Sequence, residues 1–299
     1  MTPPISIVTP SYQQGRFIER TIVSVVTQDI PGLEYVICDG GSSDETLGVL
    51  HRFSDRVGWL SEKDRGQADA VNKGIRGTHG PIIGWLNSDD VYYPGALRRV
   101  LRAFEEHPEA DLIYGKAHHI DAEDRIVEEY PTEPWNASRL LDVCYICQPA
   151  LFFRRSLADR IGLLDENLQL TMDYEYWLRA SQQGATFYYL EEFLAGSRVY
   201  PETKTLGRRV EVHREMNDML RRRVGRVPVK WIFNYAHAVV DGRGVPRTDR
   251  FRFACRVAVE SWKAAYHWYG NVPAEIRRTT WKWVWDNGRE SLARQLRRA

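Results

Sequence analysis

Two adjacent carboxylates end a hydrophobic run in the first third of the chain. Residues 81–87 are mostly apolar and lead into the sequence NSDD at 87–90. Neighbouring carboxylates repel each other unless a cation lies between them, and oxygen ligands of this kind bind Mg²⁺ or Mn²⁺, which retain water and share substrate phosphates. The segment therefore predicts a divalent-metal site, unless it is only an Asx turn that continues into residues 92–95.

Polar residues also follow three other hydrophobic runs. They are TPSY at 9–12, DGGSSDE at 39–45 and EKDRGQ at 62–67. A glycine-rich turn lets the backbone approach a ligand closely, and Ser42 and Glu45 are spaced as a capping box for a helix that follows. Taken alone, this turn is equally compatible with a capped helix that binds nothing.

Strand and helix patterns alternate in the first part of the chain. Strands are predicted at 5–10, 34–39, 57–62 and 81–87, and helices at 15–28, 44–53, 67–75 and 95–107. Such alternation predicts an α/β fold with a parallel sheet and right-handed crossovers. The four polar segments then lie together at the carboxyl edge of the sheet, where such folds bind ligands.

The pattern changes after a run at 111–121. A hairpin-like turn at 121–125, a helix near 136–142, a buried strand at 147–155 and a helix at 173–184 ended by Gly184 are predicted next. From about residue 203 the pattern is mainly helical, with a Gly/Pro break at 241–247 and amphipathic helices at 250–270 and 275–298.

Six segments in order resemble the motifs of family 2 glycosyltransferases, enzymes with the GT-A fold. They are SIVTPSY, YVICDGGSSDET, SEKDRGQADAVNKGI, IIGWLNSDDVYYPGAL, QPALFFRR and LDENLQLTMDYEYWLR, within residues 4–200. The resemblance implies a GT-A mixed sheet flanked by helices and an inverting, nucleotide-sugar-dependent transferase.

The resemblance also assigns donor-binding positions. Pro10 and Tyr12 match positions after the first strand, with Tyr12 against the nucleotide base, and Asp39 matches the aspartate that hydrogen-bonds the base. Asp64 and Arg65 match the loop that reaches the nucleotide or diphosphate of the donor.

Asp89 matches the metal-binding aspartate that ends the family's DXD motif. Asn87 stands where many members have the first aspartate, and with Ser88 it belongs to the implied donor site. An amide is a neutral ligand, so the metal is held more weakly here or Asn87 contacts ribose instead. The implied cofactor is Mn²⁺ or Mg²⁺, and the implied donor is a nucleoside-diphosphate sugar, with a UDP-sugar preferred.

Asp173 matches the aspartate of the family's ED motif, which is the general base of inverting members. Met172 replaces the usual glutamate, so a neighbouring charge is missing and the pKa of Asp173 is expected to be lower than in such members. The alternative for Asp173 is a structural role at a helix N-terminus, where the helix dipole favours a carboxylate.

A few other positions have a weaker chemical signal. Gln148 begins a strand that the family places near the acceptor. Glu191 and Glu192 follow an apolar run, and these two carboxylates could border the acceptor site. Adjacent His118 and His119 lie in a strand pattern and point to opposite faces, which argues against a shared metal.

Charge is distributed unevenly along the chain. From residue 201 onward there are 22 Lys and Arg against 10 Asp and Glu, whereas residues 1–200 have 19 against 30. Six of the ten tryptophans also lie in the basic part, namely Trp231, Trp262, Trp268, Trp281, Trp283 and Trp285. This composition suits an anionic membrane surface, and packing against the catalytic part or a second copy stays open as the alternative. The run Arg221 to Arg223 either binds lipid phosphate or is a solvated helix end.

Composition excludes several classes of protein. With 43% hydrophobic and 27% charged residues over 299 positions, the chain is neither disordered nor a disulfide-stapled miniprotein. Its four cysteines lie in or beside apolar stretches, and the lone pair Cys144 and Cys147 has no second pair for a metal. No signal peptide or spanning run is recognised, so we expect a cytoplasmic protein, at the inner membrane face if the basic part binds lipid.

The predicted organisation has a catalytic domain at 1–202 and a basic, Trp-rich helical region at 203–299. Residues 1–115 form its nucleotide-sugar half and residues 116–202 its acceptor half. We expect sugar transfer to a glycan or polyprenyl-diphosphate-linked acceptor in cell-envelope polysaccharide synthesis, a homo-oligomer as an open alternative, and no nucleic acid. Two rival classes are a sugar-phosphate nucleotidyltransferase, which releases pyrophosphate, and a non-catalytic glycan- or lipid-binding relative, which the departures at Asn87 and Met172 leave open.

Overall fold

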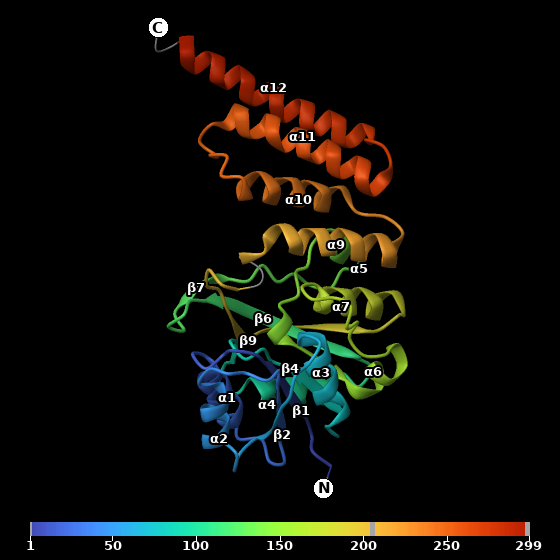
Figure 1. The fold of residues 1–299 in the computed structure, drawn as a ribbon. Helices are drawn as coiled ribbons and strands as arrows, with labels where there is room; N and C mark the ends of the chain where they lie inside the picture. The colour runs from blue at the N-terminus through green and yellow to red at the C-terminus, as the bar shows by residue number, and fades with distance from the viewer. Residues whose placement is uncertain (1, 204–206, 297–299) are drawn as a thin grey trace. The chain divides into compact units, whose positions relative to one another are not determined.

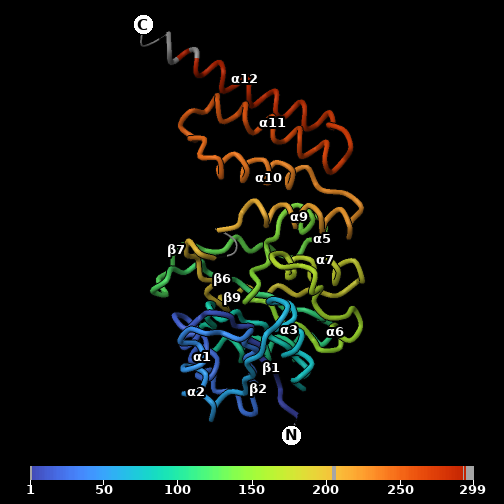
Figure 2. Tube along the Cα trace, in the orientation of Figure 1, coloured from blue at the N-terminus to red at the C-terminus, as the bar shows by residue number. Residues whose placement is uncertain are grey.

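The chain divides into two compact units, Met1–Pro201 and Glu202–Ala299. The structure, a computed structural model, describes residues 2–203 and 207–296. In Figures 1 and 2 the first unit runs from blue to yellow and the second from orange to red. The sequence predicts a division after residue 202, and the functional roles assigned to 1–115, 116–202 and 203–299 stay predictions.

The first unit is built on a nine-stranded mixed sheet. Its strand order is β3-β2-β1-β4-β8-β6-β9-β5, with β7 paired to β6. The strands are β1 Ser6–Ser11, β2 Glu34–Asp39, β3 Gly58–Ser61, β4 Ile82–Trp85, β5 Val91–Tyr92, β6 Leu112–Ile120, β7 Ile126–Glu129, β8 Leu151–Arg154 and β9 Phe187–Arg198. Strands β1 to β4 are mutually parallel, whereas β8 runs antiparallel to β4 and β6. The predicted α/β class is thus confirmed (Figure 1).

Helices connect and flank these strands. They are α1 Ile18–Val26, α2 Thr46–Arg52, α3 Gln67–Arg76, α4 Ala96–Glu106, α5 Ala137–Asp142, α6 Arg155–Ile161 and α7 Met172–Gln182. The predicted helices of this part are all present, with ends shifted by a few residues. Helix α7 is followed by Gly184, whose φ of 74° is the left-handed conformation expected after a helix end.

The core of the first unit lies on both faces of the central strands. Every residue of β1 is buried, as expected for a parallel strand covered by helices on each side. Helix α3 packs unusually close to β1, because a Cβ at Gly74 would lie 2.3 Å from Val8 Cγ1. This close packing fixes the loop before α3, which is one of the polar segments predicted to bind a ligand.

Two local predictions are wrong. The segment predicted as one strand at 147–155 begins with a short 3₁₀ turn, Gln148–Ala150, and only Leu151–Arg154 pairs in the sheet. The capping box of Ser42 and Glu45 is absent, because α2 begins at Thr46 and Glu45 makes no capping side-chain bond. Ser42 instead donates its hydroxyl to Asp39.

The second unit is helical. It contains α9 Arg209–Val224, α10 Val229–Gly242, α11 Arg250–Tyr269 and α12 Ala274–Leu296, and each helix packs against the next. The predicted break at 241–247 is confirmed. The helix predicted at 275–298 corresponds to α12, and positions 297 and 298 lie outside the described residues. Within the described ranges, no helix is both long enough and apolar enough to cross a bilayer.

Candidate active site

The loops after β1 and β2 are fastened to each other. Backbone N–H groups of the first loop donate to side chains of the second, from Gln13 to Ser42 Oγ at 2.8 Å and from Gly15 to Asp44 Oδ2 at 2.9 Å. Gln14 makes the same kind of bond to the Thr46 hydroxyl at 3.0 Å. The predicted meeting of strand ends at one sheet edge is confirmed for this pair of loops, and Tyr12 stands exposed beside them.

Asp39 ends β2 with its carboxylate buried and oriented by local donors. Its Oδ2 accepts hydrogen bonds from Gly41 N at 3.1 Å, Ser42 N at 2.8 Å and Ser61 Oγ at 2.6 Å, and its Oδ1 accepts one from Ser42 Oγ at 2.5 Å. These bonds fix the orientation of the carboxylate before any ligand arrives. Pro10 lies next to this position, paired in register with Cys38 of β2.

Asp64 lies against the glycine turn that follows Asp39. A Cβ at Gly40 would lie 2.7 Å from Asp64 Oδ2, so a larger residue at position 40 would displace the Asp64 carboxylate. Burial raises the pKa of Asp64; the charge of Lys73 lowers it, and the charges of Asp69 and Asp39 raise it. The ends of β2 and β3 therefore share one negatively charged environment.

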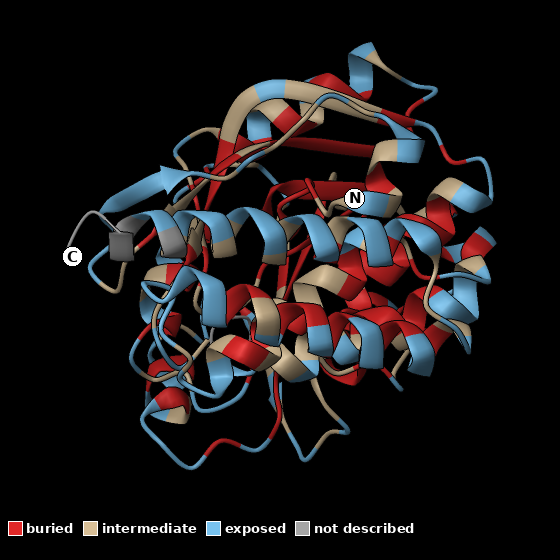
Figure 3. Cartoon of the chain, turned by 90° about the horizontal axis from the view of Figure 1, so that it is seen from above, coloured by how far each residue is buried: buried red, intermediate tan, exposed pale blue. Residues whose placement is uncertain are grey.

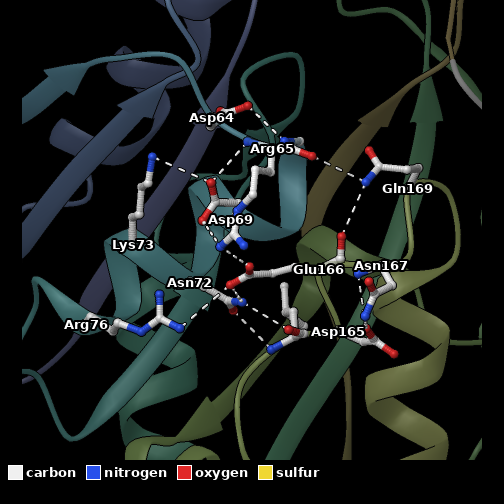
Figure 4. Close-up of polar contacts among 12 residues, drawn as sticks. Asp64, Arg65, Asp69, Asn72, Lys73, Arg76, Asp165, Glu166, Asn167 and Gln169 are labelled. Carbon is white, nitrogen blue, oxygen red and sulfur yellow. Dashed lines mark hydrogen bonds and ion pairs between the residues drawn. The ribbon is translucent and has the colours of Figure 1, made fainter.

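Arg65 is paired with carboxylates in this structure. Its Nη2 lies 3.3 Å from Asp69 Oδ1 and also contacts Glu166. The side chains of Arg65 and Glu166 point toward each other in Figure 4. Glu166 in turn accepts a hydrogen bond from Asn72 Nδ2 at 3.0 Å and lies 3.7 Å from Arg76. The loop before α3 is thus joined to the segment that leads into α7.

Gln169 extends this connection. Its Nε2 donates to the Arg65 carbonyl at 3.4 Å, and its Oε1 would lie 2.4 Å from a Cβ at Gly66. Gly66 has φ of 125°, a value that side chains disfavour, so the backbone conformation favours glycine here. The segment before Asp173 consequently lies directly on the loop that carries Asp64 and Arg65.

Asn87 is the centre of a side-chain network. Its Oδ1 accepts hydrogen bonds from Gln67 Nε2 at 2.7 Å and Trp85 Nε1 at 2.9 Å. Its Nδ2 donates to Gln148 Oε1 at 2.9 Å and to Asp90 Oδ2 at 3.3 Å. The amide therefore ties α3, β4 and the 3₁₀ turn together, and its predicted contact with donor or metal stays a prediction. Ser88 is buried beside it.

The two carboxylates of NSDD have different surroundings. Asp90 is buried and accepts from Arg198 N at 2.8 Å, and this burial, with the charge of Asp89, raises the pKa of Asp90 well above its usual value. Asp89 is half-buried, and its Oδ2 accepts the Tyr200 hydroxyl at 2.9 Å. The Arg198 guanidinium donates to the Asp89 carbonyl at 2.7 Å, so protein groups relieve part of the expected repulsion.

Asp173 lies in the first turn of α7 and is half-buried. Its Oδ1 accepts the Tyr174 backbone N–H at 2.8 Å. Burial raises the pKa of the Cys147 thiol, and the charges of Asp90 and Asp173 both raise it further. The segment after β4 and the start of α7 therefore both lie near Cys147.

Other candidates lie elsewhere or have structural partners. His118 Nδ1 lies 2.9 Å from the Tyr93 hydroxyl while His119 packs on Tyr130, so the prediction of opposite faces is confirmed. Glu191 pairs with Lys116 at 3.1 Å, and Glu192 pairs with Arg99 at 3.0 Å.

A divalent cation fits the donor set of this region only as an ion shared with a ligand. Within the described part of the chain, no group of three or more His, Cys, Asp or Glu side chains could hold a metal by itself. Asp89, the predicted ligand, has a half-buried carboxylate. Mg²⁺ and Mn²⁺ are commonly bound by one or two carboxylates together with substrate phosphates.

The structure adds residues that the sequence did not single out. Tyr200 and Arg198 contact the Asp89–Asp90 pair, Gln67 contacts Asn87, and Glu166 contacts Arg65. Glu166 lies in the motif LDENLQLTMD, seven residues before Asp173, and could be seen in the sequence. Its pairing with Arg65, 101 positions away, could not.

A mixed sheet whose parallel half ends in these acidic loops defines the GT-A class of glycosyltransferase folds. The chain belongs to glycosyl transferase family 2, whose model matches residues 6–162. An uncharacterized glycosyltransferase of Rickettsia prowazekii is 27% identical over 217 residues, which cover 68% of this chain and 66% of that protein. The chain thus spans just under two thirds of that relative's length.

Solved structures have the same fold at low sequence identity. S. aureus TarS 1–349 in complex with UDP-GlcNAc superposes with a TM-score of 0.61 and 16% identity, over 99% of this chain and 92% of that chain. The mannosyltransferase PcManGT from Pyrobaculum calidifontis, in complex with GDP-Man and Mn²⁺, superposes with a TM-score of 0.57 and 15% identity. The match covers 98% of this chain and 88% of that chain. The GT-A fold expected from the motifs is thereby confirmed.

Proposed function

We propose that this protein is an inverting glycosyltransferase that moves a sugar from a nucleoside-diphosphate sugar to an acceptor hydroxyl. The observation that carries the proposal is the bonding between the loops that hold the predicted site residues. Gln13 joins the loops after β1 and β2, Gln67 of α3 bonds Asn87 after β4, and Arg65 pairs with Glu166 before α7. Family membership and the UDP-GlcNAc and GDP-Man complexes of the two fold relatives support a nucleotide-sugar donor.

The donor is held by the loops after β1 to β4. Asp39, whose orientation is fixed by four hydrogen bonds, accepts from the base, and Tyr12 covers the base from its exposed position. Pro10 and Ser88 shape the backbone beside it. Arg65 lies on the surface and reaches the diphosphate once it leaves Glu166.

Transfer needs a proton acceptor and stabilisation of the leaving group. The acceptor hydroxyl attacks the anomeric carbon, the bond from that carbon to the diphosphate oxygen breaks, and Asp173 takes the hydroxyl proton. A divalent cation bound through Asp89, Mn²⁺ or Mg²⁺, would stabilise the negative charge that gathers on the departing diphosphate. Met172 stands where the family has a glutamate, so the residue directly before Asp173 carries no charge.

The acceptor is a glycan or a polyprenyl-diphosphate-linked sugar, in cell-envelope polysaccharide synthesis. We place the protein at the cytoplasmic side of the membrane, because the second unit is basic and rich in tryptophan. A sugar-phosphate nucleotidyltransferase would use a similar metal and diphosphate site, but it would release pyrophosphate instead of nucleoside diphosphate.

A thermal-shift panel tests the donor. UDP-, GDP- and dTDP-sugars are added with and without Mn²⁺, and we expect one nucleotide class to raise the Tm in a metal-dependent way, with nucleoside diphosphate as the product. A shift with nucleoside triphosphate and release of pyrophosphate would replace the proposal with the nucleotidyltransferase. No shift and no turnover with any sugar nucleotide would favour a non-catalytic relative.

A further inference from the structure

The second unit carries a group of large side chains that are exposed although they are apolar or aromatic. Tyr266 is 69% exposed on α11, and Trp281 and Trp285 are 62% and 67% exposed on α12. Val259 and Trp262 are exposed on α11 as well. We call these five residues the aromatic patch.

The patch is continuous across the two helices. Residues 259, 262 and 266 are spaced by three and four and share one face of α11, as do 281 and 285 on α12. The Trp262 and Trp281 rings meet edge to face with centroids 6.2 Å apart, and Trp262 Nε1 donates to Thr280 Oγ1 at 2.8 Å. The two helix faces therefore form one surface, and Figure 3 looks onto these helices with their exposed positions in pale blue.

The interior of the unit is filled by other tryptophans. Trp231 and Trp268 are buried, and Trp268 Nε1 donates to Asp218 at 2.8 Å. Trp283 is half-buried and packs on Phe233 with centroids 4.7 Å apart. These rings fill the interior of the unit, so the exposed faces of the patch are not needed to fill its core.

Cations accompany the patch on both helices. Residues 250–296 contain nine Lys and Arg against four Asp and Glu. One of the four acids, Glu260, is buried and neutralised by Arg243 at 2.8 Å and Lys263 at 3.0 Å. Exposed cations on the outward faces are Arg252, Arg256 and Lys263 of α11 and Arg278, Lys282 and Arg289 of α12.

We infer that the aromatic patch binds the surface of an anionic lipid bilayer. Indole and phenol rings favour the headgroup layer, and each cation near anionic lipid strengthens binding about fivefold. A second copy is disfavoured as the occupant, because two identical faces would bring their cations together. The exposed acids Glu275, Asp286 and Glu290 on α12 likewise disfavour a nucleic-acid backbone. This inference is independent of the proposed sugar transfer.

Vesicle flotation of the full chain tests the inference. Vesicles of phosphatidylcholine, with and without phosphatidylglycerol, are compared at low and high salt. We expect binding only with phosphatidylglycerol, weakened by salt. The double substitution Trp281→Ser with Trp285→Ser should abolish flotation, and Arg278→Gln with Lys282→Gln should weaken the apparent Kd about thirtyfold.

A matched control replaces exposed apolar residues of the other unit. Ile126 and Val127 on β7 are 60% and 58% exposed, and Ile126→Ser with Val127→Ser should float like the parent chain. Circular dichroism and Tm establish that each variant is folded, and donor turnover with a water-soluble acceptor should be unchanged. Equal flotation of the tryptophan variant and the parent would overturn the inference. The inference would also be overturned if the tryptophan variant lost self-association or RNA binding but still floated with the vesicles.

Discussion

At the scale of single residues, the candidate site is a set of carboxylates whose surroundings differ. Asp39 is oriented by four hydrogen bonds, Asp90 is buried with a raised pKa, and Asp89 keeps a half-buried carboxylate that accepts from Tyr200. Of the NSDD pair, Asp89 is therefore the better ligand for a cation, because burial favours the neutral form of Asp90.

We expect Asp89→Ala to weaken metal-dependent donor binding by about 10- to 100-fold, the range for losing a contact to a charged group. Calorimetric titration of the donor with and without Mn²⁺ measures this. Tyr200→Phe is the matched control, since it removes the hydrogen bond to Asp89 but keeps the carboxylate, and it should retain metal-dependent binding. An unchanged response of Asp89→Ala to EDTA would show that Asp89 is not the ligand.

Residue types and order were enough to predict that the polar loops after β1 and β2 meet at one edge of the sheet. The partners that orient them were not predictable, because they come from distant parts of the chain. Asn87 illustrates this: its amide is engaged by Gln67 and Gln148, which lie 20 and 61 positions away. Only the folded backbone brings such pairs together.

At the scale of elements, an ion pair between Glu166 and Arg65 joins the segment before α7 to the loop before α3 (Figure 4). If Arg65 binds the diphosphate, Glu166 competes for it. Glu166→Gln should therefore tighten donor binding by roughly threefold, with little change in stability because Arg65 is exposed.

Donor Kd and Tm are measured side by side for this variant. Glu191→Gln is its control, since it removes an exposed ion pair with Lys116 elsewhere on the sheet. Weaker or unchanged donor binding in Glu166→Gln would mean that the Arg65–Glu166 pair does not compete with the donor.

Helix α9 contains a group that makes stability depend on pH. The pKa of His213 is lowered to about 4, because its ring is buried and Arg209 lies nearby. In the unfolded chain the His213 ring takes up a proton near pH 6.5, whereas in the folded chain it does so only near pH 4. The contribution of His213 to stability is therefore lost progressively as the pH drops from about 6.5 toward 4.

We expect the free energy of unfolding to decrease less on acidification in His213→Gln than in the parent chain, by on the order of 1–3 kcal/mol. Urea unfolding at about pH 7 and about pH 5 measures the difference, with exposed His51→Gln as the control. A parent chain as stable at the lower pH as at the higher one would contradict the assignment.

Periodicity predicted strands β1 to β4 and the helices of the first unit except α6, since each of these has a clear hydrophobic pattern. It failed at residues 148–150, where Pro149 and the bonds of Gln148 to Asn87 and the Trp85 carbonyl favour a 3₁₀ turn over a strand. It also missed the 12-residue strand β9, because Glu191 and Glu192 interrupt its apolar residues.

At the scale of the whole molecule, the charge asymmetry along the chain corresponds to two units with different surfaces. The acidic first unit carries the candidate active site, and the basic second unit carries the aromatic patch. Activity toward a soluble acceptor and binding to vesicles should therefore be separable by substitution, each variant impairing one property only.

The most direct test of the proposed transfer is Asp173→Asn, followed by donor titration and product analysis. The account predicts donor binding like that of the parent, turnover lower by about 10²- to 10⁴-fold, and a parent product of inverted anomeric configuration. Exposed Asp142→Asn should behave like the parent. Near-normal turnover in Asp173→Asn, or a parent product with retained configuration, would contradict the assignment of Asp173 as the base of an inverting transfer.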